Sequence, residues 1–134
     1  MPYPSRMKFK VQLRMRIYRD EGIAVGPGKI ALLEAIADTG SISAAARQLG
    51  MSYRRAWLLG NEINSMFREP SIFTRHGGKS GGGAGLTPFG AELLARYRRM
   101  EEIANQAICA DLDWLGSQTE PGFRPEDSKA PPVR

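Results

Sequence analysis

The stretch that decides the fold is residues 41–67, which read SISAAARQLGMSYRRAWLLGNEINSMF. It holds two helical segments, 42–49 and 53–67, and each follows a serine whose hydroxyl can accept a hydrogen bond from the first turn. Three residues separate the segments, and the first is Gly50, a residue type that commonly ends a helix. So short a link makes the two helices cross steeply. The sequence therefore predicts a helix-turn-helix.

Upstream of this motif the sequence predicts one more helix and a strand. Residues 29–39 carry apolar side chains at helical spacing and stop at Gly40. Residues 8–18 read KFKVQLRMRIY, in which apolar and polar side chains alternate. This period of two predicts a half-buried strand, and Asp20-Glu21-Gly22 supplies a turn after it.

Downstream the sequence predicts a hairpin and then a long helix. Residues 72–75 are predicted to form a strand, and a second extended segment is predicted at Leu86. Residues 77–85, which lie between them, contain six glycines, so this glycine run is expected to form the hairpin tip. Thr87 can cap a helix that begins at Pro88 and meets no breaker except Gly90 until Gly116. Beyond that point lie four of the nine prolines and few apolar residues, which is typical of a disordered tail.

The predicted order of elements is strand, three helices, hairpin and long helix. A helix-turn-helix followed by a hairpin is the layout of a winged helix. The predicted fold class is therefore mainly α with a small β-hairpin, a winged helix-turn-helix with a long C-terminal helix. The predicted parts are an N-terminal tail (1–8), the winged helix-turn-helix domain (9–87), the long helix (88–115) and the disordered tail (116–134).

Composition excludes several classes of protein. Among 134 residues there is one cysteine, Cys109, and one histidine, His76, which is too few for a disulfide framework or a usual zinc site. The acids Asp38, Glu62 and Glu69 are scattered over helices, so no catalytic site, metal or cofactor is expected. No apolar run approaches the roughly 20 residues of a membrane span. The sequence predicts a cytoplasmic, nucleoid-associated protein that is not an enzyme.

Charge points to a polyanionic partner. Residues 1–100 carry 16 basic and 7 acidic residues, a net charge of +9, whereas residues 101–134 carry a net charge of −4. Arginine outnumbers lysine 14 to 5, and its planar guanidinium suits phosphate and base edges. A basic body of this kind favours binding to double-stranded DNA.

The first turn of segment 53–67 is the best candidate for contact with bases. Ala56, Leu59, Gly60, Ile63 and Phe67 form an inward stripe, which leaves Tyr53, Arg54, Arg55, Asn61 and Asn64 outside it. Arg54 and Arg55 point about 100° apart, so one is expected to read a base and the other to bind phosphate. Trp57 is interpreted as a packing residue rather than a DNA contact.

The glycine-rich hairpin is expected to serve as a wing whose backbone and side chains contact the sugar-phosphate edge. Its candidate side chains are Arg75, His76 and Lys79; the alternative is a surface loop that touches nothing. The full set of predicted DNA-binding residues is Ser41, Ser43, Ser52, Tyr53, Arg54, Arg55, Asn61, Arg75, Lys79, Gly81 and Gly82. A protein-interaction module that kept the fold without specific DNA binding is the alternative function.

The long helix carries an apolar seam with steps of four and three residues, which is typical of a short coiled coil. We expect it to hold a homodimer. The predicted dimerisation residues are Leu93, Tyr97, Met100, Ala104, Ala107 and Ile108.

These motifs resemble a known family. Residues 40–46, GSISAAA, are similar to the helix-turn-helix of LysR-type regulators, and the longer pattern resembles the N-terminal domain of ModE-type molybdate-responsive regulators. The residues that carry the resemblance are Gly40-Ser41-Ile42-Ser43, Ser52-Tyr53, Ala56-Trp57, Gly77-Gly78-Lys79, Gly81-Gly82-Gly83-Ala84, Leu86-Thr87 and Gly90. The resemblance implies a dimeric bacterial winged-helix DNA-binding domain. Such regulators carry a second half that binds molybdate; this chain has a proline-rich tail where that half would begin, so molybdate sensing is not expected of it.

Overall fold

The computed structural model describes residues 9–78 and 81–122. The chain folds into two compact units. The larger unit, Leu13–Glu102, contains the helix-turn-helix and the hairpin, and the smaller one combines the residues up to Gln12 with those from Ile103 onward. No helix among the described residues has both the length and the apolar character needed to cross a bilayer.

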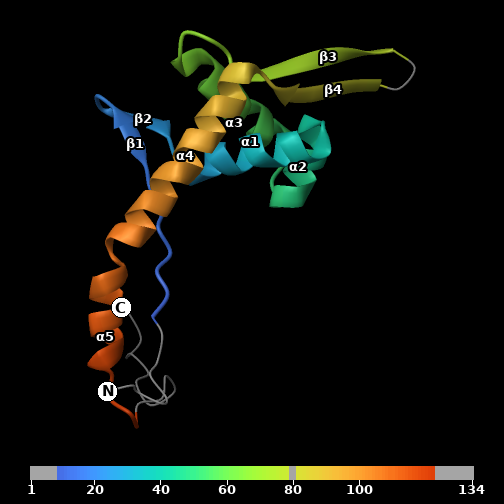
Figure 1. Cartoon of the computed structure of the whole chain (residues 1–134). Helices are drawn as coiled ribbons and strands as arrows, with labels where there is room; N and C mark the ends of the chain where they lie inside the picture. Colours follow the sequence, from blue (N-terminus) through green and yellow to red (C-terminus); the bar gives the residue numbers. More distant parts are fainter. Residues whose placement is uncertain (1–8, 79–80, 123–134) are drawn as a thin grey trace, which may run out of the picture. The chain divides into compact units, whose positions relative to one another are not determined.

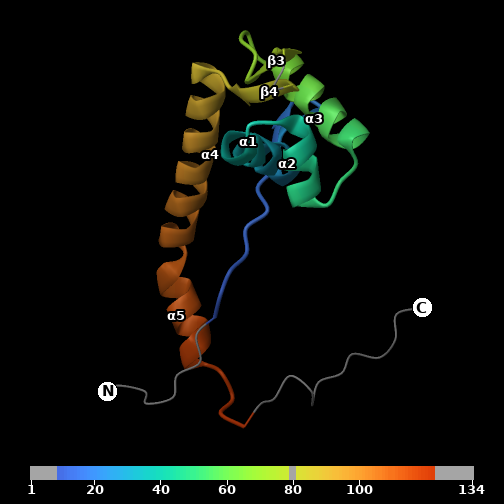
Figure 2. The same cartoon turned by 90° about the vertical axis from the view of Figure 1, so that its right-hand side faces the viewer.

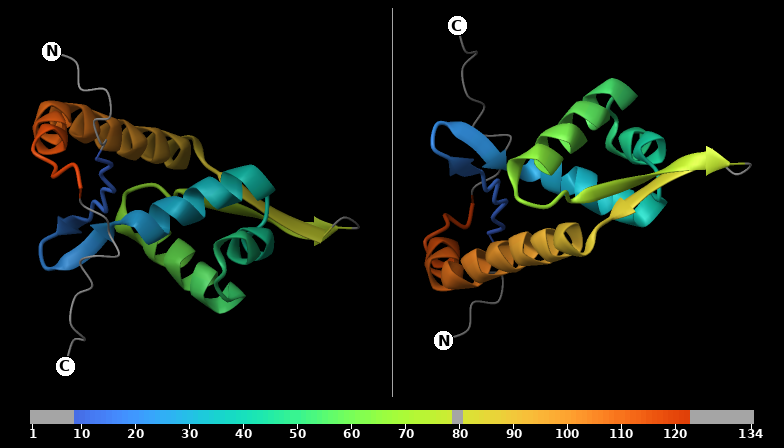
Figure 3. Two further views of the ribbon diagram at one scale, coloured as in Figure 1. Left: turned by 90° about the horizontal axis from the view of Figure 1, so that it is seen from below. Right: turned by 90° about the horizontal axis from the view of Figure 1, so that it is seen from above.

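The larger unit is a mainly α winged helix-turn-helix, as the sequence predicts. Its elements are β1 (Ile17–Arg19), β2 (Gly22–Val25), α1 (Pro27–Thr39), α2 (Ile42–Leu49), α3 (Tyr53–Met66), β3 (Ile72–Gly78), β4 (Gly81–Leu86) and the greater part of α4 (Pro88–Ala107). Helices α1, α2 and α3 gather into one bundle (Figure 2), and the β3–β4 hairpin projects beyond them (Figure 1, Figure 3).

Local signals fix the ends of the helix-turn-helix. Ser41 Oγ accepts a hydrogen bond from the Ala44 amide at 2.9 Å, and Ser52 Oγ accepts one from the Arg55 amide at 3.1 Å. Gly50 ends α2 with a φ of 69°, a left-handed conformation that L side chains rarely adopt. The predicted bounds of both helices are confirmed to within one residue.

One apolar core lies between α1 and the elements packed around it. The most deeply buried large side chains are those of Ile30, Leu32, Leu33, Ile36, Ile63 and Tyr97. The Tyr97 hydroxyl donates a hydrogen bond to the Met15 carbonyl, which ties the segment before β1 to α4. An ion pair of 2.5 Å between Arg98 and Glu34 joins α4 to α1. These contacts bring α4 into the body of the larger unit.

The strand predicted over residues 8–18 is mostly wrong. Residues 9–16 form no regular structure, and only Ile17–Arg19 pair, antiparallel, with a short strand that the sequence did not predict, Gly22–Val25. A period-two pattern becomes a strand only where a partner supplies hydrogen bonds, and the four residues of β2 are too short a partner for eleven. The predicted turn lies between the two strands, with Asp20 at a φ of 53°.

The predicted hairpin is confirmed, but the glycine run is more than its tip. Ile72 pairs with Leu86 and Arg75 with Gly83, so most of the run is strand β4. The register shifts between Arg75 and Gly78. Residues 79 and 80 lie outside the described residues.

The predicted continuous helix from Pro88 to about 115 is wrong at one point. Helix α4 ends at Ala107, and a second helix, α5 (Cys109–Ser117), begins two residues later. Between them Ile108 has a φ of −103° and a ψ of 5°, away from helical values. Neither glycine nor proline stands there, so the sequence carries no local signal for the interruption. Gly116 and Ser117, predicted as the start of the tail, belong to α5.

Candidate nucleic-acid interface

The first turn of α3 presents its polar side chains to solvent. The Ser52 cap starts the helix, and Tyr53, Arg54 and Arg55 are all exposed. Within residues 9–78 and 81–122, neither arginine takes part in an ion pair. Their guanidinium groups therefore keep their donors for an external partner.

A groove of about 400 Å³ joins this turn to α2 and to the hairpin. It brings together four of the predicted DNA-binding residues, Ser41, Ser43, Tyr53 and Arg75. The other residues that line it are Ile42, Thr74, Gly83 and Ala84. Side chains from α2, α3 and β3 thus converge on one surface, although more than 30 residues separate those of α2 from those of β3 in the sequence.

Two sets of hydrogen bonds hold the hairpin at this groove. The Ala84 amide donates to the Gly40 carbonyl at 2.8 Å, which fixes β4 to the turn between α1 and α2. The Asn64 carboxamide accepts from the amides of Ser71 and Ile72, each at 2.8 Å, and donates to the Ile72 carbonyl at 3.0 Å. The expectation that Asn64 lies outside the inward stripe is therefore corrected. It is half-buried and binds the start of β3, and no local pattern signals this role because its partners lie across a turn.

The inward stripe of α3 is confirmed for Ala56, Gly60 and Ile63, which are buried, whereas Leu59 and Phe67 are half-buried. Trp57, interpreted as a packing residue, is instead 47% exposed. The small residues Ala56 and Gly60 let α3 lie close to the core. The Trp57 side chain points about 100° away from that of Ala56 around the helix axis, so its bulky indole stays at the surface. Asn61 is exposed, as predicted.

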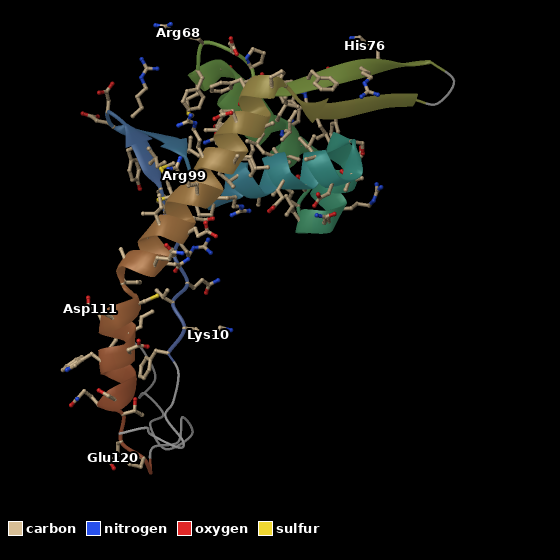
Figure 4. The ribbon with its side chains drawn as sticks, viewed as in Figure 1. Lys10, Arg68, His76, Arg99, Asp111 and Glu120 are labelled. Carbon is tan, nitrogen blue, oxygen red and sulfur yellow. The ribbon has the colours of Figure 1, made fainter. Side chains whose placement is uncertain are left out.

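The hairpin places its predicted residues unevenly. The Arg75 guanidinium lies 5.4 Å from the centre of the Phe73 ring, an arrangement that orients its charge. His76 is exposed farther along β3 (Figure 4). Gly81 and Gly82 are part of β4, and Lys79 lies outside the described residues.

The residues predicted for dimerisation do not form one exposed set. Tyr97 is 1% exposed and belongs to the core of the larger unit, so its assignment to a dimer seam is corrected. Burial raises the pKa of Tyr97 above its ordinary value, and the nearby Glu101 carboxylate raises it further. Leu93 is half-buried against the core, whereas Met100 is 39% exposed. The other three residues belong to the smaller unit, in which Ala107 is exposed and Ala104 and Ile108 are half-buried.

Comparison with known proteins finds relatives whose names refer to molybdenum or to transcriptional regulation. No protein-family model matches it. It is 48% identical over 80 residues to the molybdenum-pterin-binding protein MopB of Rhodobacter capsulatus, covering 60% of this chain and 30% of the relative. It is 40% identical over 88 residues to the molybdenum transport protein ModE of Azotobacter vinelandii, covering 66% and 33%.

A third relative extends the match farther along the chain. The DNA-binding transcriptional dual regulator ModE of Escherichia coli is 36% identical over 107 residues, which cover 78% of this chain and 38% of the relative. The chain spans about a third of the length of the curated relatives it matches. Over the matched residues, the winged helix-turn-helix of this chain is of the ModE type.

Proposed function

We propose that this chain is a sequence-specific DNA-binding transcriptional regulator. The observation that carries the proposal is the groove where Ser41, which caps α2, Ser43 of α2, Tyr53 of α3 and Arg75 of β3 converge, with two more exposed arginines in the same helical turn as Tyr53. A helix inserted into the major groove and a wing along the backbone would give these residues one common ligand. The name of the Escherichia coli relative, a DNA-binding transcriptional dual regulator, supports the same function.

The residues divide into two kinds of contact. Arg54 and Arg55, at the start of α3, would supply one contact to a guanine edge and one to a phosphate. The hydroxyl groups of Ser41 and Ser43 lie at the first turn of α2, where a phosphate is favoured by the helix dipole and by free amides. Arg75 and Lys79 would bind the adjoining backbone from the hairpin.

We further propose that the chain acts as a homodimer on a palindromic operator. Met100 and Ile103 expose large apolar side chains on α4, and the predicted seam continues through Ala104, Ala107 and Ile108. Two-fold symmetry would present two copies of α3 to half-sites about 34–36 Å apart, one turn of DNA.

A selection experiment tests the proposal. The chain is incubated with a random-sequence DNA duplex library, bound duplexes are recovered through several rounds, and the affinity for the enriched site is compared with that for a scrambled duplex. A regulator enriches one palindromic motif and binds it at least about 1,000-fold more tightly than the scrambled duplex. A protein-interaction module of the same fold would enrich no motif and would bind both duplexes alike.

We expect Arg54→Ala and Arg55→Ala to weaken binding in two different ways. The variant that loses a base contact should lose about 1–3 kcal/mol on the selected site and accept more sequences. The one that loses a phosphate contact should weaken all duplexes about equally. Fluorescence anisotropy on selected and scrambled duplexes distinguishes them.

Arg96→Ala is the matched control for this pair. It removes one guanidinium from α4, where Arg96 pairs with Glu92 at 2.7 Å on an exposed surface, so DNA affinity should stay unchanged. Parent-like affinity in both the Arg54 and the Arg55 variant would show that α3 is not the recognition helix.

For the hairpin we expect Lys79→Ala to lower affinity for selected and random duplexes together. One lost phosphate contact should reduce the slope of log affinity against log salt by about one. Titrations between low and physiological salt measure that slope. An unchanged slope would mean that this side chain does not contact phosphate.

A further inference from the structure

A second groove, of about 190 Å³, lies beside α3 and continues the first. Ile42 and Thr74 line both grooves, so the two form one surface. The residues that line the second are Ile42, Trp57, Gly60, Asn61, Asn64, Ile72 and Thr74. Its chemistry differs from that of the first, because Trp57 places a large, 47% exposed apolar surface in it.

The position of Trp57 along α3 relates it to the polar first turn. It follows Tyr53 by four residues and precedes Asn61 by four, and residues four apart lie on the same side of a helix. The side of α3 that carries Tyr53 into the first groove therefore carries Trp57 and Asn61 into the second. If α3 lies in the major groove of DNA, all three side chains face base edges.

Base chemistry limits what can meet an indole there. The major-groove edges of the four bases carry hydrogen-bond donors and acceptors and only one apolar group, the C5 methyl of thymine. The neighbouring Asn61 adds a carboxamide, the group that pairs with N6 and N7 of adenine. An apolar surface next to a carboxamide suits the two members of an A·T pair.

We propose that Trp57, together with Ile42, receives the C5 methyl of a thymine in the operator, so that Trp57 determines sequence preference. The proposal rests on the proposed DNA-binding function. Two observations favour a nucleic acid over a protein as the occupant: the second groove continues the polar groove, which Arg75 lines, and Arg54 and Arg55 are exposed in the same helical turn as Tyr53.

The test replaces thymine by 2′-deoxyuridine, which differs only in lacking the methyl group. Each thymine of the site selected from the random library is replaced in turn, and the dissociation constant of the parent chain is measured by fluorescence anisotropy. At one or more positions we expect the dissociation constant to rise about three- to fivefold, the effect of one buried methyl group. At those positions Trp57→Ala and Trp57→Gln should bind the two duplexes equally.

The other tryptophan provides the matched control. Trp114 on α5 is 61% exposed and lies outside both grooves, so Trp114→Ala should keep the parental ratio between thymine and deoxyuridine duplexes. Far-ultraviolet circular dichroism confirms that each variant is folded, and the second Trp57 substitution guards against a defect specific to alanine.

Three results would overturn the inference. Equal binding of parent to every deoxyuridine duplex would remove the methyl contact while leaving the proposed function intact. If both Trp57 variants kept the parental ratio between thymine and deoxyuridine duplexes, another residue would contact the methyl group. If both variants bound DNA as tightly as the parent chain, the exposed indole would be assigned to a protein partner. Failure to enrich any motif would instead refute the proposed function itself, and this inference with it.

Discussion

Gly90→Ala is expected to lower the free energy of unfolding by about 3 kcal/mol, because there is no room for a β-carbon at the start of α4. A Cβ at this position would lie 2.1 Å from the carbonyl oxygen of Ser71 and 2.9 Å from its carbonyl carbon. The neighbour is backbone and cannot rotate away. The same carbonyl accepts the Thr87 amide at 3.0 Å, so separating α4 from Ser71 also breaks the bond that joins the helix to the start of β3.

Chemical denaturation followed by circular dichroism measures this effect, and Gly28→Ala is the matched control. Gly28 stands in the first turn of α1, where an added Cβ meets no atom within 4 Å. Alanine there should raise the free energy of unfolding by up to about 1 kcal/mol, since it reduces the freedom of the unfolded chain. If both variants unfolded at the same denaturant concentration, the close approach of α4 to Ser71 would be refuted.

The helix-turn-helix could be predicted because its signals are local. Ser41 and Ser52 bond to amides three residues away, and Gly50 adopts its left-handed conformation within its own turn. Such signals need no distant partner. The hairpin was predictable for a related reason, since its two strands are close in sequence.

The predictions that are wrong concern residues whose environment depends on segments far away in the sequence. Tyr97 and Trp57 exchanged their expected roles: the seam residue is buried and the packing residue is exposed. Tyr97 is covered because Met15 approaches from 82 positions away, a contact that no helical period reveals. The exposure of Trp57 could not be predicted from the sequence, because the helical period shows which residues share a face but not which face packs against a neighbour.

The candidate site shows the same division. The exposed first turn of α3 follows from its amphipathic pattern, so Arg54 and Arg55 were identified from sequence alone. The groove itself was not, because it depends on the Ala84–Gly40 hydrogen bond and on Asn64 to place the hairpin against α2. Asn61 and Asn64, three residues apart on one helix, therefore have different roles: one faces solvent and the other fixes β3.

Substituting glutamate for both Met100 and Ile103 is expected to give monomers that keep non-specific DNA binding and lose about 100-fold or more in operator affinity. Each of these side chains is well exposed in the single chain, 39% for Met100 and 54% for Ile103, so charging them should leave the fold intact. In a dimer built on this seam they would bring like charges together in a buried contact. Tyr97 does not serve the test, since a charge in its buried position would unfold the larger unit.

The loss of affinity follows from linkage between half-sites. Once one recognition helix is bound, a dimer presents the second at a high local concentration, which commonly raises the overall affinity by a factor of about 100 to 10,000. Separated subunits lose that factor but keep every direct contact of one half-site. The salt dependence per half-site should therefore persist while the operator preference falls.

Sedimentation equilibrium at micromolar concentration separates the possibilities. The parent chain should sediment at twice its 14.8 kDa, and the double variant at 14.8 kDa. Asn105→Glu is the control for a carboxylate added to α4, because it adds one negative charge about 200° around the helix from Ile103 and should leave the dimer intact. A parent chain that sediments at 14.8 kDa would refute the dimer. A double variant that remains dimeric would place the contact on another surface, and the half-site spacing expected of the operator would then lose its basis.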